Sequence, residues 1–507
     1  MPSGSYLAKI MAVFFGTSNP TQAGVLARGL KQGKFRKLAS RIYSDDLHSP
    51  VEEIIRHYRL EIAAHFYPSA VISHRSAIEP SIQGTLHLTT DGASSTHKLP
   101  GLVIRAWQGP PPQPDDIQTT FGENILYTSS QPRAILENLQ TAKPRENDQP
   151  KTLPQQDFEL WLDRHIRILG IAWLHQMLGQ TEALAARLQW QASHKRFQDI
   201  ANAVLGKPSR HRFATEVGKA RAKGTPFDPQ RLDLFQKLHV RLAKEAFQST
   251  RATPPAEAGN RAFWEAYFSN YIEGTKFTVE EAQAIVYLKN NVHDNLLRKR
   301  PADAHDILET YRLIHDRNIS ASTPDSPGAL IEILKRRHAR MMASRLDVQP
   351  GVLKTTNNMV GARTFVAPEL VEETLARGWQ LCRTLPPAAH RALYILFLVA
   401  EVHPFNDGNG RVSRLCMNAE LEAAGQGRLI IPTSLRNDYL AVLEALTSSG
   451  NPEPYIAFGH KLIEINNHLP FDSFEATHKY LLQAGALDET PVFFNLGSLA
   501  ANQPKTT

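Results

Sequence analysis

The sequence predicts a mainly α-helical protein with a smaller mixed α/β module at its N-terminal end. An apolar run, Leu393–Ala400, predicts a buried helix, and Leu415–Leu421 predicts a second one after a short polar loop. Alternating residues at Thr85–Thr89 and Leu102–Ala106 predict strands in the first module. A chain of 507 residues is long enough for two or three domains.

The first module is expected to span residues 1–145. Between Thr21 and Tyr43, apolar positions alternate with basic ones: Arg28, Lys31, Lys34, Arg36, Lys37 and Arg41. This pattern fits a DNA-binding helix-turn-helix with a wing, and it equally fits a solvated basic face. Residues 29–43 resemble the winged-helix start of AbiEi-type antitoxin regulators, and Val71–Ala77 and Ile125–Leu136 resemble that family's next domain. The resemblance implies a regulatory or DNA-binding module, in which we expect His74 and Arg75 to be structural.

A linker and a helical connector are expected next. Residues 141–155 are rich in Pro, Lys, Glu and Asn, a composition typical of linkers. Residues 157–250 follow a helical pattern, interrupted by Gly206, Pro208, Gly224 and Pro226. We assign no chemistry to this connector.

The loop between the two buried helices carries the chemistry. Pro404 turns His403 away from the helical region, so the first helix should end there. Gly408 and Gly410 permit positive φ, and successive amides in such a loop form an anion nest. If the second helix begins near Gly410, its dipole adds to the attraction for phosphate. The side chains then supply a general base, a hard oxygen ligand for Mg²⁺ and two arginines on one helix face: His403, Asp407, Arg411 and Arg414. This set predicts attack of a hydroxyl on a nucleotide phosphate.

The run His403–Arg411 resembles the Fic motif, H-P-F-x-[D/E]-G-N-[G/K]-R, at every position, and Arg414 matches the second arginine of many members. Fic proteins are helical enzymes, most of which transfer AMP from ATP to a Ser, Thr or Tyr hydroxyl of a target protein. The resemblance implies that His403 is the base, that Asp407 holds Mg²⁺ and that Arg414 reaches the γ-phosphate. The remaining motif residues would cradle the α- and β-phosphates or anchor the loop: Gly408, Asn409, Gly410 and Arg411, and Phe405 as the anchor.

A helix over residues 260–274 resembles the inhibitory helix, [S/T]-x-x-x-E-[G/N], of Fic proteins. Ser269 and Glu273 are four residues apart and share a face, and Gly274 is a helix stop. Thr278 begins a capping box for the next helix. By resemblance, Glu273 pairs with Arg414 and blocks the γ-phosphate site. In some relatives this glutamate also helps to remove AMP, so reversal is possible here.

Residues 351–368 alternate and turn as a hairpin does, which fits a purely structural hairpin and also resembles the Fic flap. A flap aligns the target segment over the active site by strand-like pairing, and Val360 and Gly361 are candidates for nucleotide contact. Lys354 stands where relatives usually have Arg, and Ala367 where they often have Pro. Tyr439 lies in a stretch that resembles the adenine side of relatives. The expected Fic domain spans residues 256–470, followed by an accessory tail, 471–507.

Composition bounds the remaining properties. The net charge of +7 is compatible with nucleotide or nucleic-acid binding. The two cysteines, Cys382 and Cys416, indicate a reducing compartment without a disulfide framework. No apolar run approaches the length of a membrane span, so we expect a cytoplasmic protein with no membrane partner.

The sequence therefore predicts an ATP- and Mg²⁺-dependent protein adenylyltransferase, restrained by Glu273. Its expected partners are a target protein with a hydroxyl side chain, the enzyme itself as a substrate, DNA through the first module, and a second copy in a homodimer. Two alternatives stay open. One is a Fic enzyme that removes AMP or uses another phosphate-containing donor, and the other is a nucleotide-sensing DNA-binding regulator.

Overall fold

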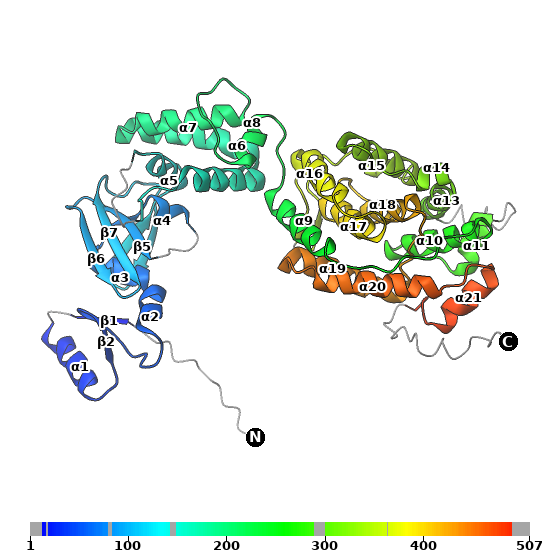
Figure 1. Ribbon diagram of the computed structural model, residues 1–507. Coiled ribbons are helices and arrows are strands. Elements are labelled where there is room, and N and C mark those ends of the chain that lie inside the picture. Colours follow the sequence, from blue (N-terminus) through cyan, green and yellow to red (C-terminus); the bar gives the residue numbers. More distant parts are fainter. Residues whose placement is uncertain are drawn as a thin grey trace. The chain divides into compact units, whose positions relative to one another are not determined.

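The computed structural model describes residues 13–16, 19–79, 84–141, 149–287, 300–361 and 363–488. The chain divides into two compact units, Met1–Gly224 and Thr225–Thr507 (Figure 1). The expected connector 157–250 is therefore not one element, because its last helix, α9 (Pro229–Leu242), belongs to the second unit. Phe235, Leu238 and Leu242 of α9 are buried in the core of that unit.

The first unit begins with a three-stranded antiparallel sheet in the order β1-β3-β2. Its elements are β1 (Val13–Phe15), α1 (Pro20–Lys31), β2 (Arg36–Ala39) and β3 (Ile42–Ser44). The prediction of a helix-turn-helix between Thr21 and Tyr43 is wrong, because the described residues there hold a single helix. Gly33 adopts a φ of 65°, which ends α1 in a turn, and the two strands that follow, β2 and β3, pair as a hairpin.

A second, six-stranded mixed sheet has the order β6-β7-β5-β4-β9-β8. Its strands are β4 (Val71–Ile72), β5 (Thr85–Thr90), β6 (Ser95–Leu99), β7 (Leu102–Gln108), β8 (Ile117–Phe121) and β9 (Asn124–Thr128). The strands predicted at Thr85–Thr89 and Leu102–Ala106 are β5 and β7, paired in parallel. Four short helices accompany the sheet: α2 (Val51–His57), α3 (Arg59–Phe66), α4 (Arg75–Ile78) and α5 (Gln131–Asn138).

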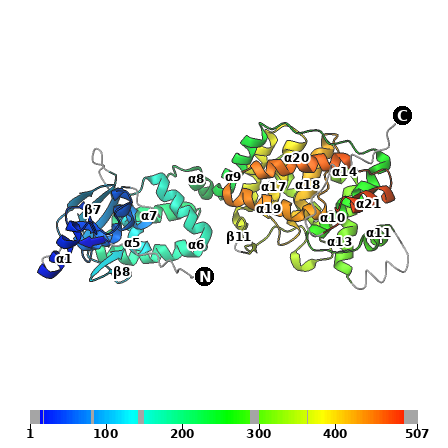
Figure 2. The same cartoon turned by 90° about the horizontal axis from the view of Figure 1, so that it is seen from below.

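Three further helices complete the first unit: α6 (Gln155–Leu188), α7 (Gln191–Val204) and α8 (Glu216–Ala222). The predicted breaks hold, since Gly206 and Pro208 lie between α7 and α8, and Gly224 and Pro226 follow α8. Residues 142–148 of the predicted linker lie outside the described residues. Figure 2 shows α6 and α7 running side by side.

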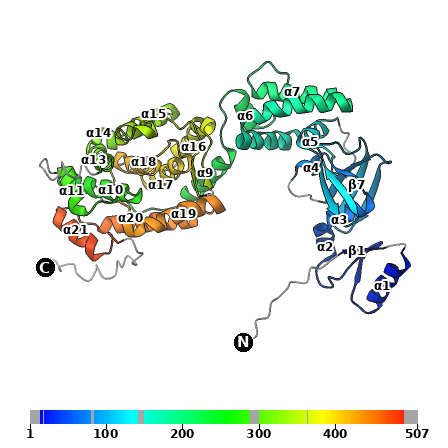
Figure 3. The same ribbon diagram turned by 180° about the vertical axis from the view of Figure 1, so that it is seen from behind.

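The second unit is a helical bundle around α17 (Ala389–Val402) and α18 (Asn409–Ala423). These two helices pack on each other, with α15 and α16 on one side and α19 and α20 on the other (Figure 3). The other helices are α10 (Ala258–Ile272), α11 (Val279–Tyr287), α13 (Pro301–His315), α14 (Arg317–Ser320), α15 (Pro327–Met341), α16 (Val371–Arg383), α19 (Arg436–Ser449), α20 (Glu453–His468) and α21 (Phe474–Gln483). The predicted flap is a hairpin of β10 (Met359–Val360) and β11 (Arg363–Thr364).

The end of the chain differs from the expected accessory tail. Phe471, Leu481 and Ala486 are buried in the same core as α17, so this part of the tail belongs to the bundle. Residues 489–507 lie outside the described residues. Both cysteines are free and buried. Within the described part of the chain, no helix is both long and apolar enough to span a membrane.

Candidate active site

The loop between α17 and α18 is closed by Asn409, the first residue of α18. Its side-chain oxygen accepts from the backbone N–H of Phe405 at 2.8 Å, and its amide donates to the Phe405 carbonyl at 2.8 Å. The ring of Phe405 is fully buried, as the sequence predicted. His403 has a φ of 56° and Gly408 a φ of 75°, so both ends of the loop use left-handed backbone. The Asn409 side chain therefore fixes the loop.

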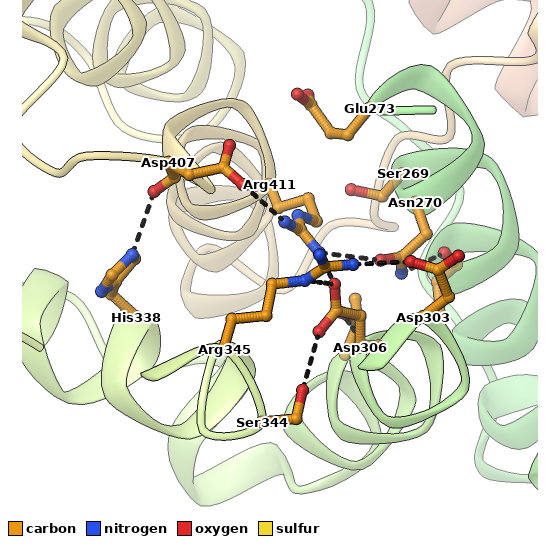
Figure 4. A network of polar contacts seen from close by, with 12 residues as sticks. Ser269, Asn270, Glu273, Asp303, Asp306, His338, Ser344, Arg345, Asp407 and Arg411 are labelled. Atoms are coloured by element: carbon orange, nitrogen blue, oxygen red, sulfur yellow. Dashed lines mark hydrogen bonds and ion pairs between the residues drawn. The ribbon is translucent and has the colours of Figure 1, made fainter. Parts of the chain in front are cut away.

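His338 of α15 supports the same loop and was missed by the sequence analysis. Its ring stacks on Phe405 at 3.9 Å between centroids. The Gly351 N–H donates to Nδ1 at 2.9 Å, so Nε2 carries the proton and donates to the Asp407 carbonyl at 3.0 Å (Figure 4). Burial lowers the pKa of His338 to about 4, which keeps the neutral tautomer that these two bonds require.

His403 is the candidate base, and its ring is buried. Nδ1 lies 3.3 Å from the Ala400 carbonyl, which can only accept, so Nδ1 donates and Nε2 keeps a free lone pair. The ring stacks on Phe365 at 3.8 Å between centroids. Burial, assisted by the positive charges of Lys354 and Arg363, lowers the pKa of His403 to about 4. The imidazole is therefore neutral at pH 7 and can accept a proton.

Lys354 lies in the segment before the flap, which contacts the loop between α17 and α18. Its backbone N–H donates to the Pro404 carbonyl at 2.9 Å, and its Nζ donates to the Val402 carbonyl at 3.4 Å. Burial, with Arg231 nearby, lowers the pKa of Lys354 to about 7. The lysine that departs from the flap pattern thus brackets His403 by bonding the carbonyls on either side of it.

Arg414 is held by residues at the end of α10. Its Nε donates to the Ser269 hydroxyl at 3.0 Å, and Nη2 donates to the Ser269 carbonyl at 2.8 Å and to Glu273 Oε1 at 2.7 Å. Burial alone would lower the pKa of Arg414, but the Glu273 carboxylate and the Tyr439 side chain together outweigh it, and the pKa is raised. Gly274 has a φ of 94° and ends the helix, which leaves Glu273 as its last side chain.

The Glu273 carboxylate also covers the start of α18. A Cβ placed on Gly410 would lie 2.2 Å from Glu273 Oε1, so a side chain at this position would collide with the carboxylate. Gly410 therefore brings the backbone into direct contact with an anionic group. In the structure this anionic group is the Glu273 carboxylate, whereas the sequence predicts a phosphate beside Gly410.

Arg411 differs in surroundings from the expected phosphate ligand. Its guanidinium is buried and lies 2.7 Å from Asp306 of α13 and 3.3 Å from Asn270 of α10 (Figure 4). Asp306 is fully buried and also accepts from Arg345 at 2.7 Å. The sequence analysis missed Asp306, which no motif marks, and the structure gives Arg411 a role in tying α18 to α13.

Asp407 presents its carboxylate to solvent. Its side chain is 54% exposed, and Arg411 lies 3.9 Å from Oδ2. The described residues contain no cluster of three or more His, Cys, Asp or Glu side chains with metal-ligand geometry. A single free carboxylate fits Mg²⁺, which commonly takes one or two carboxylates with substrate phosphates and water.

A pocket of about 290 Å³ opens beside His403. Its lining includes Glu273, Gly410 and Arg414, together with Val360 of the flap and Tyr439 of α19. Tyr439 is buried, and Val360 is 65% exposed at the flap tip. Gly361 has a φ of 59° at the hairpin turn. The pocket thus joins the base, the second arginine of the loop and the Glu273 carboxylate.

Comparison with known proteins bears on this arrangement. Residues 330–421, which include the whole loop from His403 to Arg414, match the Fic/DOC family. This part of the chain is therefore similar to the Fic/DOC family. The match starts in α15, so helix α10, which precedes Glu273, lies before it in the chain.

Similar proteins extend the likeness beyond the Fic domain. "Protein adenylyltransferase Fic" of Nematostella vectensis is 32% identical over 269 residues, covering 50% of this chain and 59% of that protein. "Protein adenylyltransferase fic-1" of Caenorhabditis elegans is 25% identical over 234 residues, covering 45% of each. The chain thus spans about half the length of the curated relatives it matches. A solved structure of C. elegans Fic-1, residues 134–508, covers 66% of this chain and 95% of that one at 20% identity, with a TM-score of 0.35.

Proposed function

We propose that this protein is an adenylyltransferase that transfers AMP from ATP to a hydroxyl side chain of a target protein, and that Glu273 restrains it. One observation carries the proposal: the neutral base His403 and the arginine Arg414 line one pocket, and Arg414 is occupied by a carboxylate of its own chain. The names of the similar proteins support the choice of AMP as the transferred group.

In the proposed reaction, the target hydroxyl oxygen attacks the α-phosphorus of ATP. The bond from that phosphorus to the oxygen bridging it to the β-phosphate breaks, and pyrophosphate leaves. The hydroxyl proton goes to Nε2 of His403, the nitrogen left free by the bond from Nδ1 to Ala400. Phe365 and Lys354 hold the ring and its flanking carbonyls in place for this transfer.

The triphosphate would lie along the start of α18. The amides at Gly408–Gly410 and the helix dipole favour negative charge there, and Arg414 would take the γ-phosphate. Asp407 would hold Mg²⁺, which when bound neutralises charge on the phosphates. Arg411 would act through Asp306, by fixing the helix that carries these groups.

Glu273 competes with the γ-phosphate for Arg414. A carboxylate at 2.7 Å satisfies the guanidinium, and it also covers Gly410, where a phosphate oxygen would lie. ATP could then bind only in a displaced pose, with its α-phosphorus out of line with the hydroxyl. Removal of the carboxylate should therefore increase transfer.

The test is label transfer from α-labelled ATP with Mg²⁺ to the protein itself and to cell-extract proteins. We expect label with Glu273→Gly at a level at least about tenfold above wild type, since a charge-assisted bond of about 2 kcal/mol is removed. We expect none with His403→Ala, although that variant should still bind ATP.

A matched pair, Glu273→Gln and Glu280→Gln, controls for the loss of a carboxylate. Glu280 is exposed on α11 and should leave transfer unchanged. Label retained in His403→Ala would remove His403 as the base. No label in any variant that binds ATP would reject AMP transfer in favour of AMP removal or another donor.

A further inference from the structure

A buried carboxylate lies two residues before His403, and nothing in the proposed chemistry uses it. Glu401 is in the last turn of α17, and its side chain has no exposed surface. A helix C-terminus disfavours negative charge, so this carboxylate needs strong partners. Arg231 of α9 provides one, with Nε 2.6 Å from Oε1, and Thr447 of α19 donates its hydroxyl to Oε2 at 2.6 Å.

The third partner comes from the flap. Arg363 of β11 donates to Glu401 and to the Thr447 hydroxyl at 2.8 Å, and it forms an ion pair with Glu444 at 3.0 Å. Arg231 reaches the flap as well, donating to the Thr364 carbonyl at 2.7 Å. Both arginines of Glu401 therefore contact the flap, and three helices and the hairpin meet at one carboxylate.

The tip of the flap has few contacts of its own that keep it ordered. At the base of the flap, Asn358 also donates to the Phe405 carbonyl at 2.8 Å. The strands of the flap share two residue pairs, and an isolated hairpin of that size is unstable in water. Met359 and Val360 at its tip are 62% and 65% exposed, so little of the tip is packed. Its order depends on anchors at its base, and Glu401 lies at the centre of them.

Arg363 also connects the flap to the imidazole ring of His403. The Arg363 guanidinium lies over the ring of Phe365 at 4.9 Å, and Phe365 stacks on His403 at 3.8 Å. A shift of Arg363 would move the ring that supports the base. The contacts thus run from Glu401 through Arg363 and Phe365 to His403, which also lies two residues after Glu401 in the chain.

We propose that Glu401 is a positioning residue that fixes the flap and the His403 ring together, through Arg363 and Arg231. The proposal rests on the proposed function for its effect on transfer, and it stands apart from the restraint by Glu273. Glu401 lines the same pocket as His403, and in this role it acts through its two arginines and not on the reacting atoms. It sets where the target segment lies relative to the base.

The test compares Glu401→Gln with wild type in the Glu273→Gly background, which makes transfer measurable. Glu401→Gln keeps the shape of the side chain and removes its charge. We expect amide hydrogen exchange of residues 355–365 to accelerate by about tenfold or more, since the hairpin loses its anchor. We expect kcat/KM for the target to fall by about 100-fold, the cost of misplacing reacting groups by about 1 Å, with Kd for ATP within about threefold.

Glu453→Gln is the matched control, because Glu453 pairs with another arginine of α9, Arg241, on the exposed surface. It should change neither quantity. Arg363→Gln tests the flap side of the contact, in case Glu401→Gln does not fold. Unchanged exchange over the flap in either folded variant overturns the proposal. Because exchange needs no activity, absence of AMP transfer in every variant would reject the proposed function and leave this test intact.

Discussion

At the scale of single residues, the absence of a side chain at Gly410 is what allows the Glu273 carboxylate to lie against the start of α18. The carboxylate fits because the glycine has no Cβ, and the same space suits a phosphate oxygen. Arg414 can pair with either anion but not with both. The proposed restraint is thus competition for one guanidinium, which requires no change of fold.

The buried state of His403 makes a prediction about pH. Its folded-state pKa of about 4 lies below the ordinary value, so the ring loses its proton acceptor only as pH falls toward 4. We expect kcat/KM for AMP transfer by Glu273→Gly to be level from pH 7.5 to about 5 and to fall below that. Initial rates of label transfer across this range measure it.

The lowered pKa of His403 also makes the folded protein less stable as the pH falls. A histidine with a depressed folded-state pKa loses its stabilising contribution as pH falls from its ordinary value through about 4. Circular dichroism at each pH must therefore confirm that the protein is folded. If kcat/KM of the folded protein instead falls around pH 6.5, the ordinary pKa of histidine, another group is the base.

At the scale of elements, α18 is tied to α13 by a buried charge. Asp306 neutralises both Arg411 and Arg345, at 2.7 Å each. Asp306→Asn would leave the buried Arg411 with only the exposed Asp407 carboxylate, at 3.9 Å, so we expect the second unit to lose about 3 kcal/mol of unfolding free energy. Urea unfolding of the full chain measures this loss.

Asp303 offers a control on the same helix. It pairs with Arg345 at 2.6 Å, but its side chain is 25% exposed. Asp303→Asn should cost less than about 1 kcal/mol, as exposed pairs do. Equal losses for the two variants would contradict a special role for the buried carboxylate.

Local signals were enough to predict the elements around the site. The apolar run and Pro404 placed the end of α17, the glycines placed the start of α18, and Thr278 and Glu281 form the predicted capping box at 2.9 and 3.2 Å. Each of these depends on residues a few positions apart.

The supports of the site could not be predicted in this way. His338 meets Asp407 across 69 positions, and Asp306 meets Arg411 across 105, with no periodicity to mark either pair. Only packing brings them together. The helix-turn-helix failed for a related reason, because the basic residues that suggested it are compatible with a helix or with a strand on a solvated face.

At the scale of the whole molecule, the chain has separate cores. The apolar cluster around α17 and α18 draws only on residues of the second unit, and the clusters around β5 and α6 draw only on the first. Units with independent cores unfold as independent transitions. The site lies wholly in the second unit, so a ligand should stabilise that unit alone.

Calorimetry of the full chain should therefore resolve two unfolding transitions. ATP with Mg²⁺ should raise the Tm of only one of them, that of the second unit. At a ligand concentration of about 100 times Kd, binding adds about 2.7 kcal/mol, which corresponds to a rise in Tm of about 5 °C. Glu273→Gly should increase the rise in Tm that ATP causes, because ATP no longer competes with a carboxylate for Arg414. Equal shifts of both transitions would mean that the units unfold together. No shift in either would mean that ATP does not bind, and the restraint by Glu273 would then have nothing to act on.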